Sequence, residues 1–341
     1  MTFSQILLDW YDVNKRPLPW RSTNDPYRIW LSEIMLQQTQ TETVKGYYAS
    51  FLERFPTVFE LADAPEDDVL KLWEGLGYYS RARNLHKAAK MVAGDMSGIF
   101  PKDAKGLRTL PGVGPYAANA IASIAYNECV PALDGNQARV LSRILAYEDV
   151  IKTPFDLHAQ AMSLISPDRP GDYNQALMDL GAGICTPKRP KCNECPVSAF
   201  CSAFKNDAAE EFPKKVPPIP KREQDMCVVI ALYNGKFLLK KRPKGLLGGL
   251  YEFCLLEGHH SPTDLAERLK EAGFGLSKIL ASLPDSKHVF THLVWRMQGY
   301  HAEVSEIPEG FIAVSPSELN KYAFPSAIRV YRECAEELVE E

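Results

Sequence analysis

Two glycines on either side of a valine are the first residues whose types and spacing indicate a binding function. Gly112, Val113 and Gly114 make a short turn, and Pro115 follows at the expected first position of a helix. Glycine permits a tight turn and proline fits a helix start, so we expect the three turn amides to point outward unpaired. The helix dipole adds positive partial charge behind them. The pattern predicts an anion-binding turn, with an ordinary connection between two helices as the alternative.

An acidic residue and a basic stretch accompany this turn. Asp134 lies twenty residues after Gly114, and we expect its carboxylate beside a phosphate backbone held by the turn. Between Tyr78 and Leu110 basic residues outnumber acidic ones, which predicts a phosphate track leading into the turn, although a solvated helix face has the same composition. The basic residues are Arg81, Arg83, Lys87, Lys90, Lys102, Lys105 and Arg108.

Four of the eight cysteines are grouped in one short segment. Because the chain shows no export signal, closely spaced thiols suit a metal centre better than disulfides. Zinc ribbons usually present two CxxC pairs, whereas a single CxxC with wider gaps favours a 4Fe-4S cluster; zinc stays the alternative. The loop between the first two cysteines is basic, so we expect a structural and DNA-docking role, with redox catalysis as the alternative. The cysteines are Cys185, Cys192, Cys195 and Cys201.

Length and charge limit the classes of protein. A chain of 341 residues with 45% hydrophobic residues can bury more than one core. The net charge of -4 argues against a protein that coats nucleic acid by bulk charge. We find no apolar run of about 18 residues and no basic start before an apolar stretch, so no membrane span or secretory signal is expected. We expect a cytoplasmic monomer that does not bind membranes.

The elements that position these residues fall into two regions. Residues 1–205 show apolar residues at three- and four-residue spacing, which predicts an all-α region. Asp25 and Pro26 predict the start of a long helix that carries Glu33, and Asp134 predicts the start of another. Residues 206–225 contain prolines among charges and predict an extended linker.

After the linker the hydrophobic period changes toward that of strands. Residues 226–341 therefore predict a separate α+β domain, and the fold class is multidomain. We expect strands over 227–232 and 236–239, a helix over 262–272, and strands around 288–293 and 296–302.

Several motifs together resemble the helix-hairpin-helix superfamily of DNA glycosylases. The closer resemblance is to its MutY family of adenine DNA glycosylases, which remove adenine mispaired with 8-oxoguanine. It implies an all-α helix-hairpin-helix lobe with a 4Fe-4S loop, base excision repair, and double-stranded DNA with A:8-oxoguanine or A:G mispairs as the partner. The motifs are RPLPWR (16–21), SEIMLQQTQ (32–40), GLGYYSRARNL (75–85), LPGVGPY (110–116), LDGNQARVLSR (133–143) and the cysteines.

The resemblance implies roles for residues around the scissile bond. Glu33 would be the general acid that protonates adenine, and Asp134 would stabilise the oxocarbenium-like sugar, electrostatically or through a covalent adduct. Tyr116 and Asn136 would tune or orient these acids.

The resemblance also implies contacts to DNA. Gln38 and Tyr78 would enter the base stack near the lesion pair, and the turn Gly112, Val113 and Gly114 would hold the backbone. Arg16, Trp20 and Arg21 would form the wall near the extruded adenine.

The C-terminal domain resembles the Nudix-like domain that reads 8-oxoguanine in this family. The family's Phe-Ser-His loop is Phe290, Thr291 and His292 here, and threonine keeps the hydroxyl. Lys270 replaces one of the paired glutamates of the hydrolytic Nudix motif, so metal-dependent pyrophosphate hydrolysis is not expected.

Two other functions compete with this interpretation. An endonuclease III-like glycosylase and lyase shares the turn, the aspartate and the cluster, but needs a lysine nucleophile where this chain has Tyr116. A structural DNA-binding protein would use the turn and cluster alone and would leave Glu33 in an apolar helix without a purpose.

Overall fold

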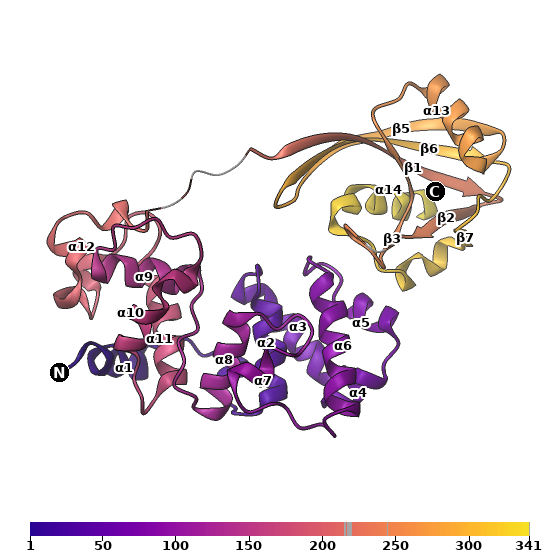
Figure 1. The fold of residues 1–341 in the computed structure, drawn as a ribbon. Coiled ribbons are helices and arrows are strands. Elements are labelled where there is room, and N and C mark those ends of the chain that lie inside the picture. Colours follow the sequence, from indigo (N-terminus) through magenta and orange to yellow (C-terminus); the bar gives the residue numbers. More distant parts are fainter. Residues whose placement is uncertain (215, 217–219, 244, 341) are drawn as a thin grey trace. The chain divides into compact units, whose positions relative to one another are not determined.

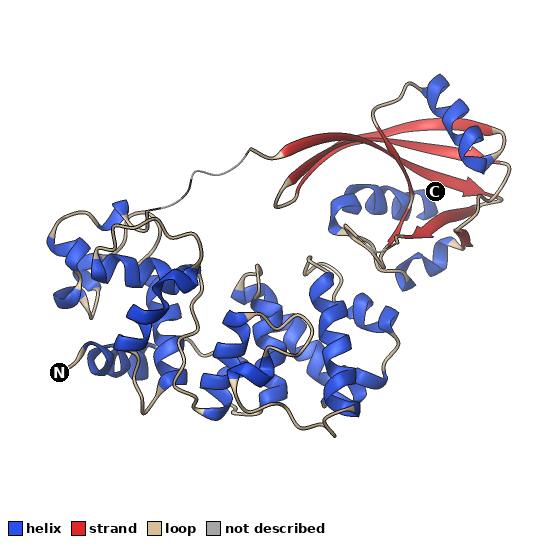
Figure 2. Cartoon of the chain, viewed as in Figure 1, coloured by secondary structure: helices blue, strands red, loops and turns tan. Residues whose placement is uncertain are grey.

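The computed structural model describes residues 1–214, 216, 220–243 and 245–340. The predicted linker falls partly outside the described residues, at positions 215 and 217–219. Chain contacts divide the protein into two compact units, residues 1–63 with 84–218 and residues 64–83 with 219–341. The boundaries at 205 and 226 stay predictions. In the described chain every helix or strand before residue 222 is a helix, and all the strands, with further helices, come from residue 222 on (Figure 2).

The first unit is built from helices, coloured from indigo through magenta to salmon in Figure 1. No helix among the described residues is long and apolar enough to cross a membrane. The helices are α1 Phe3–Asn14, η1 Pro19–Arg21, α2 Pro26–Leu36, α3 Thr41–Arg54, α4 Val58–Asp63, α6 Ser80–Gly94, α7 Ala104–Leu107, α8 Pro115–Tyr126, α9 Gly135–Leu145, η2 Pro154–Leu157, α10 His158–Leu164, α11 Pro170–Gly183, η3 Cys192–Glu194, η4 Ser198–Phe200, α12 Ser202–Lys205 and η5 Ala209–Glu211; α6 begins in the second unit.

Helix α11 organises the first unit, because it packs against α1, α8 and α9. Tyr173 and Leu177 of α11 join Leu7 of α1 and Leu141 of α9 in one core. That core also includes Val197 beside the cysteines. The same helix therefore supports both the cysteine segment and helix α9, at whose start Asp134 lies.

The second unit contains the sheet together with α5 Glu66–Leu72. Its other elements are β1 Arg222–Tyr233, β2 Lys236–Lys241, β3 Tyr251–Glu252, β4 Cys254–Glu257, α13 Pro262–Leu269, the π-helical turn η6 Lys270–Phe274, β5 Ser277–Val289, β6 Leu293–Val304, β7 Phe311–Val314, η7 Pro316–Lys321, η8 Ser326–Ile328 and α14 Arg329–Glu340.

Strand β1 is the centre of this sheet. It pairs in parallel with β6 and antiparallel with β2 and β4, and β5 lies beyond β6 at the edge. Alternate residues of β1 point to opposite faces. Val228 belongs to a core with Tyr331 of α14, whereas Val229 belongs to a core with Leu265 of α13. Burial on both faces explains the continuous apolar run at the start of the domain.

The predicted strand around 288–293 is wrong. Strand β5 ends at Val289, β6 begins at Leu293, and the amide of Phe290 donates to the carbonyl of Leu293 at 2.8 Å across the turn between them. Strand β5 was missed because most of its side chains are exposed, so its sequence lacks the apolar alternation of a half-buried strand. Phe290, Thr291 and His292 therefore form a hairpin turn.

Candidate active site

Helix α2 places Glu33 inside the first unit. The Asp25 side chain accepts a hydrogen bond from the amide of Tyr27 at 2.9 Å, and Pro26 occupies the first turn, so the helix begins as predicted. Glu33 follows two turns later on a face that is apolar and buried, and its residue is only 4% exposed. A carboxyl group so placed must either find partners or stay protonated.

Glu33 lines a cavity of the first unit, called the Glu33 cavity below. It brings together four residues that the family resemblance grouped with Glu33: Arg16, Trp20, Arg21 and Tyr116. Trp20 is buried and packs edge-on against Tyr48, with ring centroids 5.4 Å apart. The remaining lining residues are Leu18, Ile29, Ser32, Leu36, Thr41, Ile124, Gln175 and Met178.

Sequence reasoning missed the contribution of α11 to this cavity. Gln175 and Met178 line it, and the adjacent Asp179 binds both arginines of its wall. The Met178 sulfur also lies 3.9 Å from the Tyr116 hydroxyl. Positions 175, 178 and 179 are three and four residues apart and so share a helix face. This spacing is the only feature of the sequence that could have indicated their shared position. Because most helices show the same spacing, it does not single out these residues.

Burial raises the pKa of Glu33 to about 7. The Tyr116 hydroxyl donates to Glu33 Oε2 at 3.0 Å and opposes this rise, the negative charge of Asp134 adds to it, and the positive charge of Arg21 opposes it. Burial also raises the pKa of Tyr116, so its phenol stays a hydrogen-bond donor. A carboxyl group that titrates near neutral pH is able to give up a proton to a bound ligand.

Asp134 is the N-cap of α9 and is held at both carboxylate oxygens. Its Oδ1 accepts the amide of Gln137 at 2.7 Å, and its Oδ2 accepts Asn136 Nδ2 at 3.1 Å. Burial raises the pKa of Asp134, and these hydrogen bonds oppose the rise. The carboxylate therefore caps α9 as predicted, and its two hydrogen bonds fix its orientation.

A chain of hydrogen bonds runs from Asp134 to the cysteine segment. Asn136 Oδ1 accepts Arg139 Nη2 at 3.0 Å, and Arg139 Nε donates to the carbonyl of Cys185 at 2.9 Å. Arg139 also donates to the carbonyl of Gly181 at 2.8 Å. The start of α9 and the first cysteine are thus fixed relative to one another.

The glycine turn lies between α7 and α8, and the two glycines differ. Gly112 has φ 78°, and a Cβ there would come within 2.7 Å of Asn84 Cβ, so this position requires glycine. Gly114 has φ -80°, and a Cβ there would meet open space. The expectation of three free amides is wrong at Val113, whose amide donates to the carbonyl of Leu110 at 3.1 Å. The amides of Gly112 and Gly114 have no such partner among the described residues.

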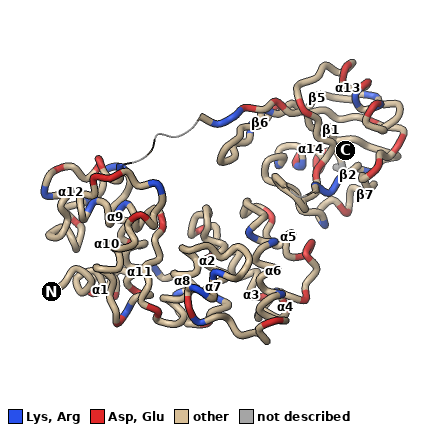
Figure 3. Tube along the Cα trace, viewed as in Figure 1, with Lys and Arg blue, Asp and Glu red and all other residues tan. Residues whose placement is uncertain are grey.

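The basic stretch before the turn is only partly a surface feature. Arg81 is buried, stacks on Trp73 and donates to the carbonyls of Leu76 and Gly77, because the turn that begins α6 encloses it. Arg83 donates to the carbonyl of Gly248 within the second unit. The prediction that both belong to a phosphate track is therefore wrong. The exposed residues, drawn with the other charges in Figure 3, are Lys87, Lys90, Lys102, Lys105 and Arg108.

The four cysteines of the quartet line one small cavity between α9, α11 and the loops after them. Arg143 is nearly fully buried there and donates to Cys185 Sγ at 3.3 Å and to the carbonyls of Thr186 and Pro187 at 2.7 and 3.0 Å. Among the described residues no three His, Cys, Asp or Glu side chains converge on one metal ion. Thiols arranged around a cavity suit a cluster, in which each thiolate binds its own iron, and the buried guanidinium complements their negative charge.

In the second unit the hairpin turn lies beside Tyr78. The Tyr78 hydroxyl is 3.2 Å from Thr291 Oγ1, and both residues line a cavity with Phe290 and His292. Tyr78 is 50% exposed and has φ 47°, a left-handed backbone that is strained for a side chain of this size. Gln38, exposed in the first unit, has φ 58°. Both residues expected to enter the base stack thus occupy strained turns.

Comparison with known families assigns both halves of the chain. Residues 31–167 match the HhH-GPD superfamily of base excision DNA repair proteins, and residues 226–333 match the NUDIX domain. Residues 185–201 match the iron-sulfur binding domain of endonuclease III, which confirms the predicted iron–sulfur cofactor at the four cysteines.

Several curated relatives share the name adenine DNA glycosylase. The protein from Arabidopsis thaliana is 42% identical over 72% of this chain, and the match covers 46% of that relative's length. The protein from Rattus norvegicus is 37% identical, with 87% of this chain and 70% of the relative covered. The Homo sapiens protein is 34% identical over 96% of this chain and 72% of its own length.

Solved structures resemble the helical part of the chain. A thermostable thymine-DNA glycosylase matches with TM-score 0.56 and 31% identity, covering 60% of this chain and 95% of the other. An endonuclease III–DNA complex matches with TM-score 0.52 and 22% identity, covering 61% and 98%. The second likeness establishes the fold alone. The helix-hairpin-helix lobe and the Nudix-like domain predicted from the sequence are confirmed.

Proposed function

This chain belongs to the adenine DNA glycosylase family, and we propose that it hydrolyses the N-glycosidic bond of adenine mispaired with 8-oxoguanine or guanine in duplex DNA. The reaction leaves an abasic site. One observation carries the proposal: Glu33 is buried, has a pKa of about 7 and accepts a hydrogen bond from Tyr116 in a cavity lined by Trp20. A proton donor inside a cavity with an aromatic wall suits an extruded purine.

Two carboxyl groups would divide the chemistry. Glu33 donates a proton to the adenine ring, because the neutral base leaves far more readily than the anion. Asp134, oriented by Gln137 and Asn136, stabilises the positive charge that develops on the sugar, electrostatically or through a covalent adduct. Water then completes the hydrolysis. The cluster supplies structural support, and Arg139 connects its first cysteine to Asn136.

DNA would bind through the glycine turn and the exposed basic residues near it. The amides of Gly112 and Gly114 and the dipole of α8 form a site for a backbone phosphate, and open space at Gly114 allows a close approach. Gln38 and Tyr78 would enter the base stack. A monomeric enzyme in the cytoplasm stays our prediction.

We expect the enzyme to be a glycosylase without lyase activity, because the position of the lyase nucleophile is Tyr116. Its buried phenol is not an amine and cannot form a Schiff base with the sugar. Borohydride added during turnover should therefore trap little covalent protein–DNA complex. An established lyase assayed in parallel on its own substrate is the positive control. Trapping as efficient as that of the lyase would reassign the chain to the bifunctional class.

We propose that the second unit reads 8-oxoguanine through the hairpin turn. Thr291 offers a hydroxyl beside that of Tyr78, and both residues line the same cavity with Phe290 and His292. A hydroxyl is able to form a hydrogen bond with the altered edge of 8-oxoguanine. If guanine does not make this hydrogen bond, the enzyme prefers 8-oxoguanine by the free energy of that one bond.

Thr291→Ala should lower the ratio of excision from A:8-oxoguanine to excision from A:G by about twofold to twelvefold, since one hydrogen bond contributes about 0.5–1.5 kcal/mol. Both rates are measured in single turnover at equal salt, because phosphate contacts are salt-dependent and common to both substrates. Thr291→Ser keeps the hydroxyl and should keep the ratio. An unchanged ratio in Thr291→Ala would place the discrimination elsewhere in the chain.

A further inference from the structure

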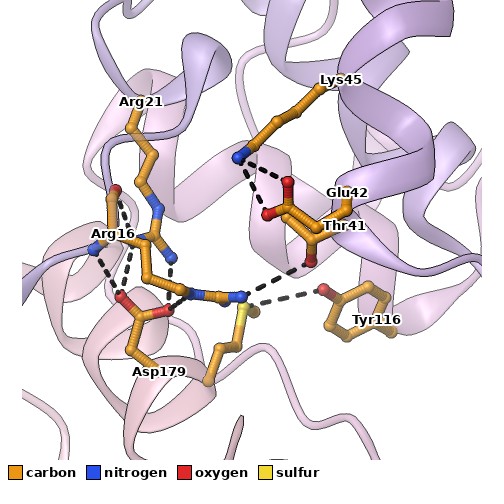
Figure 4. A network of polar contacts seen from close by, with 8 residues as sticks. Arg16, Arg21, Thr41, Glu42, Lys45, Tyr116 and Asp179 are labelled. Carbon is orange, nitrogen blue, oxygen red and sulfur yellow. Dashed lines mark hydrogen bonds and ion pairs between the residues drawn. The ribbon is translucent and has the colours of Figure 1, made fainter. Parts of the chain in front are cut away.

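Asp179 of α11 joins two arginines of the Glu33 cavity. Its Oδ1 accepts Arg16 Nε at 2.6 Å and Arg21 Nη2 at 2.9 Å, and its Oδ2 accepts Arg21 Nη1 at 2.6 Å and the backbone amide of Arg16 at 3.3 Å. The Asp179 side chain is 3% exposed. Figure 4 shows the Asp179 carboxylate joined to both arginines, with Tyr116 and Thr41 at the far end of the Arg16 side chain.

Asp179 is the partner that the two arginine side chains share. Arg16 lies in the loop between α1 and η1, and Arg21 ends the short η1. The Arg16 carbonyl accepts the Leu18 amide at 2.9 Å and Arg21 Nη1 at 3.3 Å. Arg21 is bound to Asp179 in a two-pronged pair, which fixes the plane of its guanidinium group. Arg16 Nη1 reaches Thr41 of α3 at 3.5 Å. The carboxylate on the rigid helix α11 thus anchors a loop that forms the wall of the cavity.

The same carboxylate sets the charge of that wall. Without it two guanidinium charges would stand next to a carboxyl group that must hold a proton. The charged and titratable groups that face Glu33 are Tyr116 of α8, Asp134 at the start of α9, Arg21 of η1 and Arg16 of the loop before it. Arg21 already lowers the pKa of Glu33. Burial raises the pKa of Asp179, but the hydrogen bonds and charges of Arg21 and Arg16 together outweigh it, so the pKa lies below its usual value and the group is ionised at neutral pH.

We propose that Asp179 is the positioning residue of the Glu33 cavity: it fixes Arg16 and Arg21 in the cavity wall and offsets their positive charge next to the general acid. The inference rests on the proposed function of Glu33 as that acid. It assigns to Asp179 an effect on both the rate of base release and its dependence on pH, without contact to the base.

The test is Asp179→Asn in the full-length holoenzyme, because asparagine keeps the shape and removes the charge. Single-turnover release of adenine should fall by about tenfold or more, since small displacements of positioned groups lower rates strongly. The pH at which the rate falls to half should move down by about one unit, because a nearby positive charge favours the ionised carboxyl group. Binding to DNA containing an uncleavable adenine analogue should change less than threefold.

Two further variants separate positioning from general stability. Asp172→Asn changes another aspartate of α11, which pairs with the N-cap residue Arg169 and does not line the Glu33 cavity, and it should match the parent in rate and pH profile. Asp179→Glu keeps the charge but lengthens the side chain, so its rate should fall about fivefold or more with the pH midpoint unchanged. A parental rate in both Asp179 variants, or a lower rate in Asp179→Asn with an unmoved midpoint, would overturn the proposal.

A readout without catalysis keeps this inference separate from the proposed function. The carboxyl carbon of Glu33 is titrated by NMR in free parent and free Asp179→Asn protein, with Glu33→Gln used to assign the signal. The titration midpoint should be lower in Asp179→Asn. An inactive parent together with this shift would refute the glycosylase function alone, whereas an active parent with identical midpoints would refute the role of Asp179 alone.

Discussion

Glu33→Gln is expected to release adenine at least a hundredfold more slowly than the parent while binding lesion DNA with similar affinity. The amide keeps the shape and can still accept the hydrogen bond from Tyr116, but it has no acidic proton to give. Positioned acid catalysis usually contributes a factor of about a hundred to ten thousand. Single-turnover kinetics at saturating enzyme separates base release from binding.

The matched control is Glu42→Gln, on α3 near the same cavity. Glu42 is 79% exposed and pairs with Lys45 at 2.9 Å, so its variant removes a carboxylate of the same type without touching the chemistry (Figure 4). Its rate should stay within about twofold of the parent, since exposed ion pairs contribute little. Base release in Glu33→Gln within tenfold of the parent would contradict the role of Glu33 as general acid.

The pH profile of the parent follows from the same group. The pKa of Glu33 is raised to about 7, and the reaction needs its protonated form, so the rate should be high below pH 7 and fall as the pH rises through 7. Glu33→Gln should lose this decline along with the rate. A decline that persists in the variant would assign it to another group.

Asp134→Asn should lower single-turnover base release by about two to three orders of magnitude, the usual effect of removing one preorganised electrostatic group. Asparagine is about as good an N-cap as aspartate, and it can accept the amide of Gln137, so helix α9 should keep its stability. The melting temperature is measured beside the rate. The free energy of unfolding of Asp134→Asn should stay within about 1 kcal/mol of the parent value.

The outcome also distinguishes two roles of Asp134. If the residue only caps α9, the amide should preserve the rate together with the melting temperature. If its charge stabilises the sugar cation, the rate falls while the melting temperature stays. Loss of both would instead indicate that Asn136 and Arg139, which extend the hydrogen-bond chain to Cys185, need the carboxylate for folding.

Short-range features of this protein follow from the sequence by itself. The four cysteines lie within one segment, Asp25 and Asp134 start helices, and the glycine turn connects α7 to α8, as their order in the chain predicts. Capping, turn formation and ligand spacing depend on residues a few positions apart, so local sequence carries them. The family motifs add the identity of Glu33, which its apolar surroundings alone did not reveal.

Only the tertiary structure decided which side chains are solvent-exposed and which charges meet. Asp179 binds Arg16 across 163 positions of the chain, Arg81 turns inward, and the Val113 amide is already occupied. Long-range pairs form where packed helices bring them together, and no local pattern records that geometry. Burial of Glu33 depends on all of its neighbours in space. Because burial raises the pKa of Glu33 to about 7, this helix carboxyl group is able to act as a proton donor.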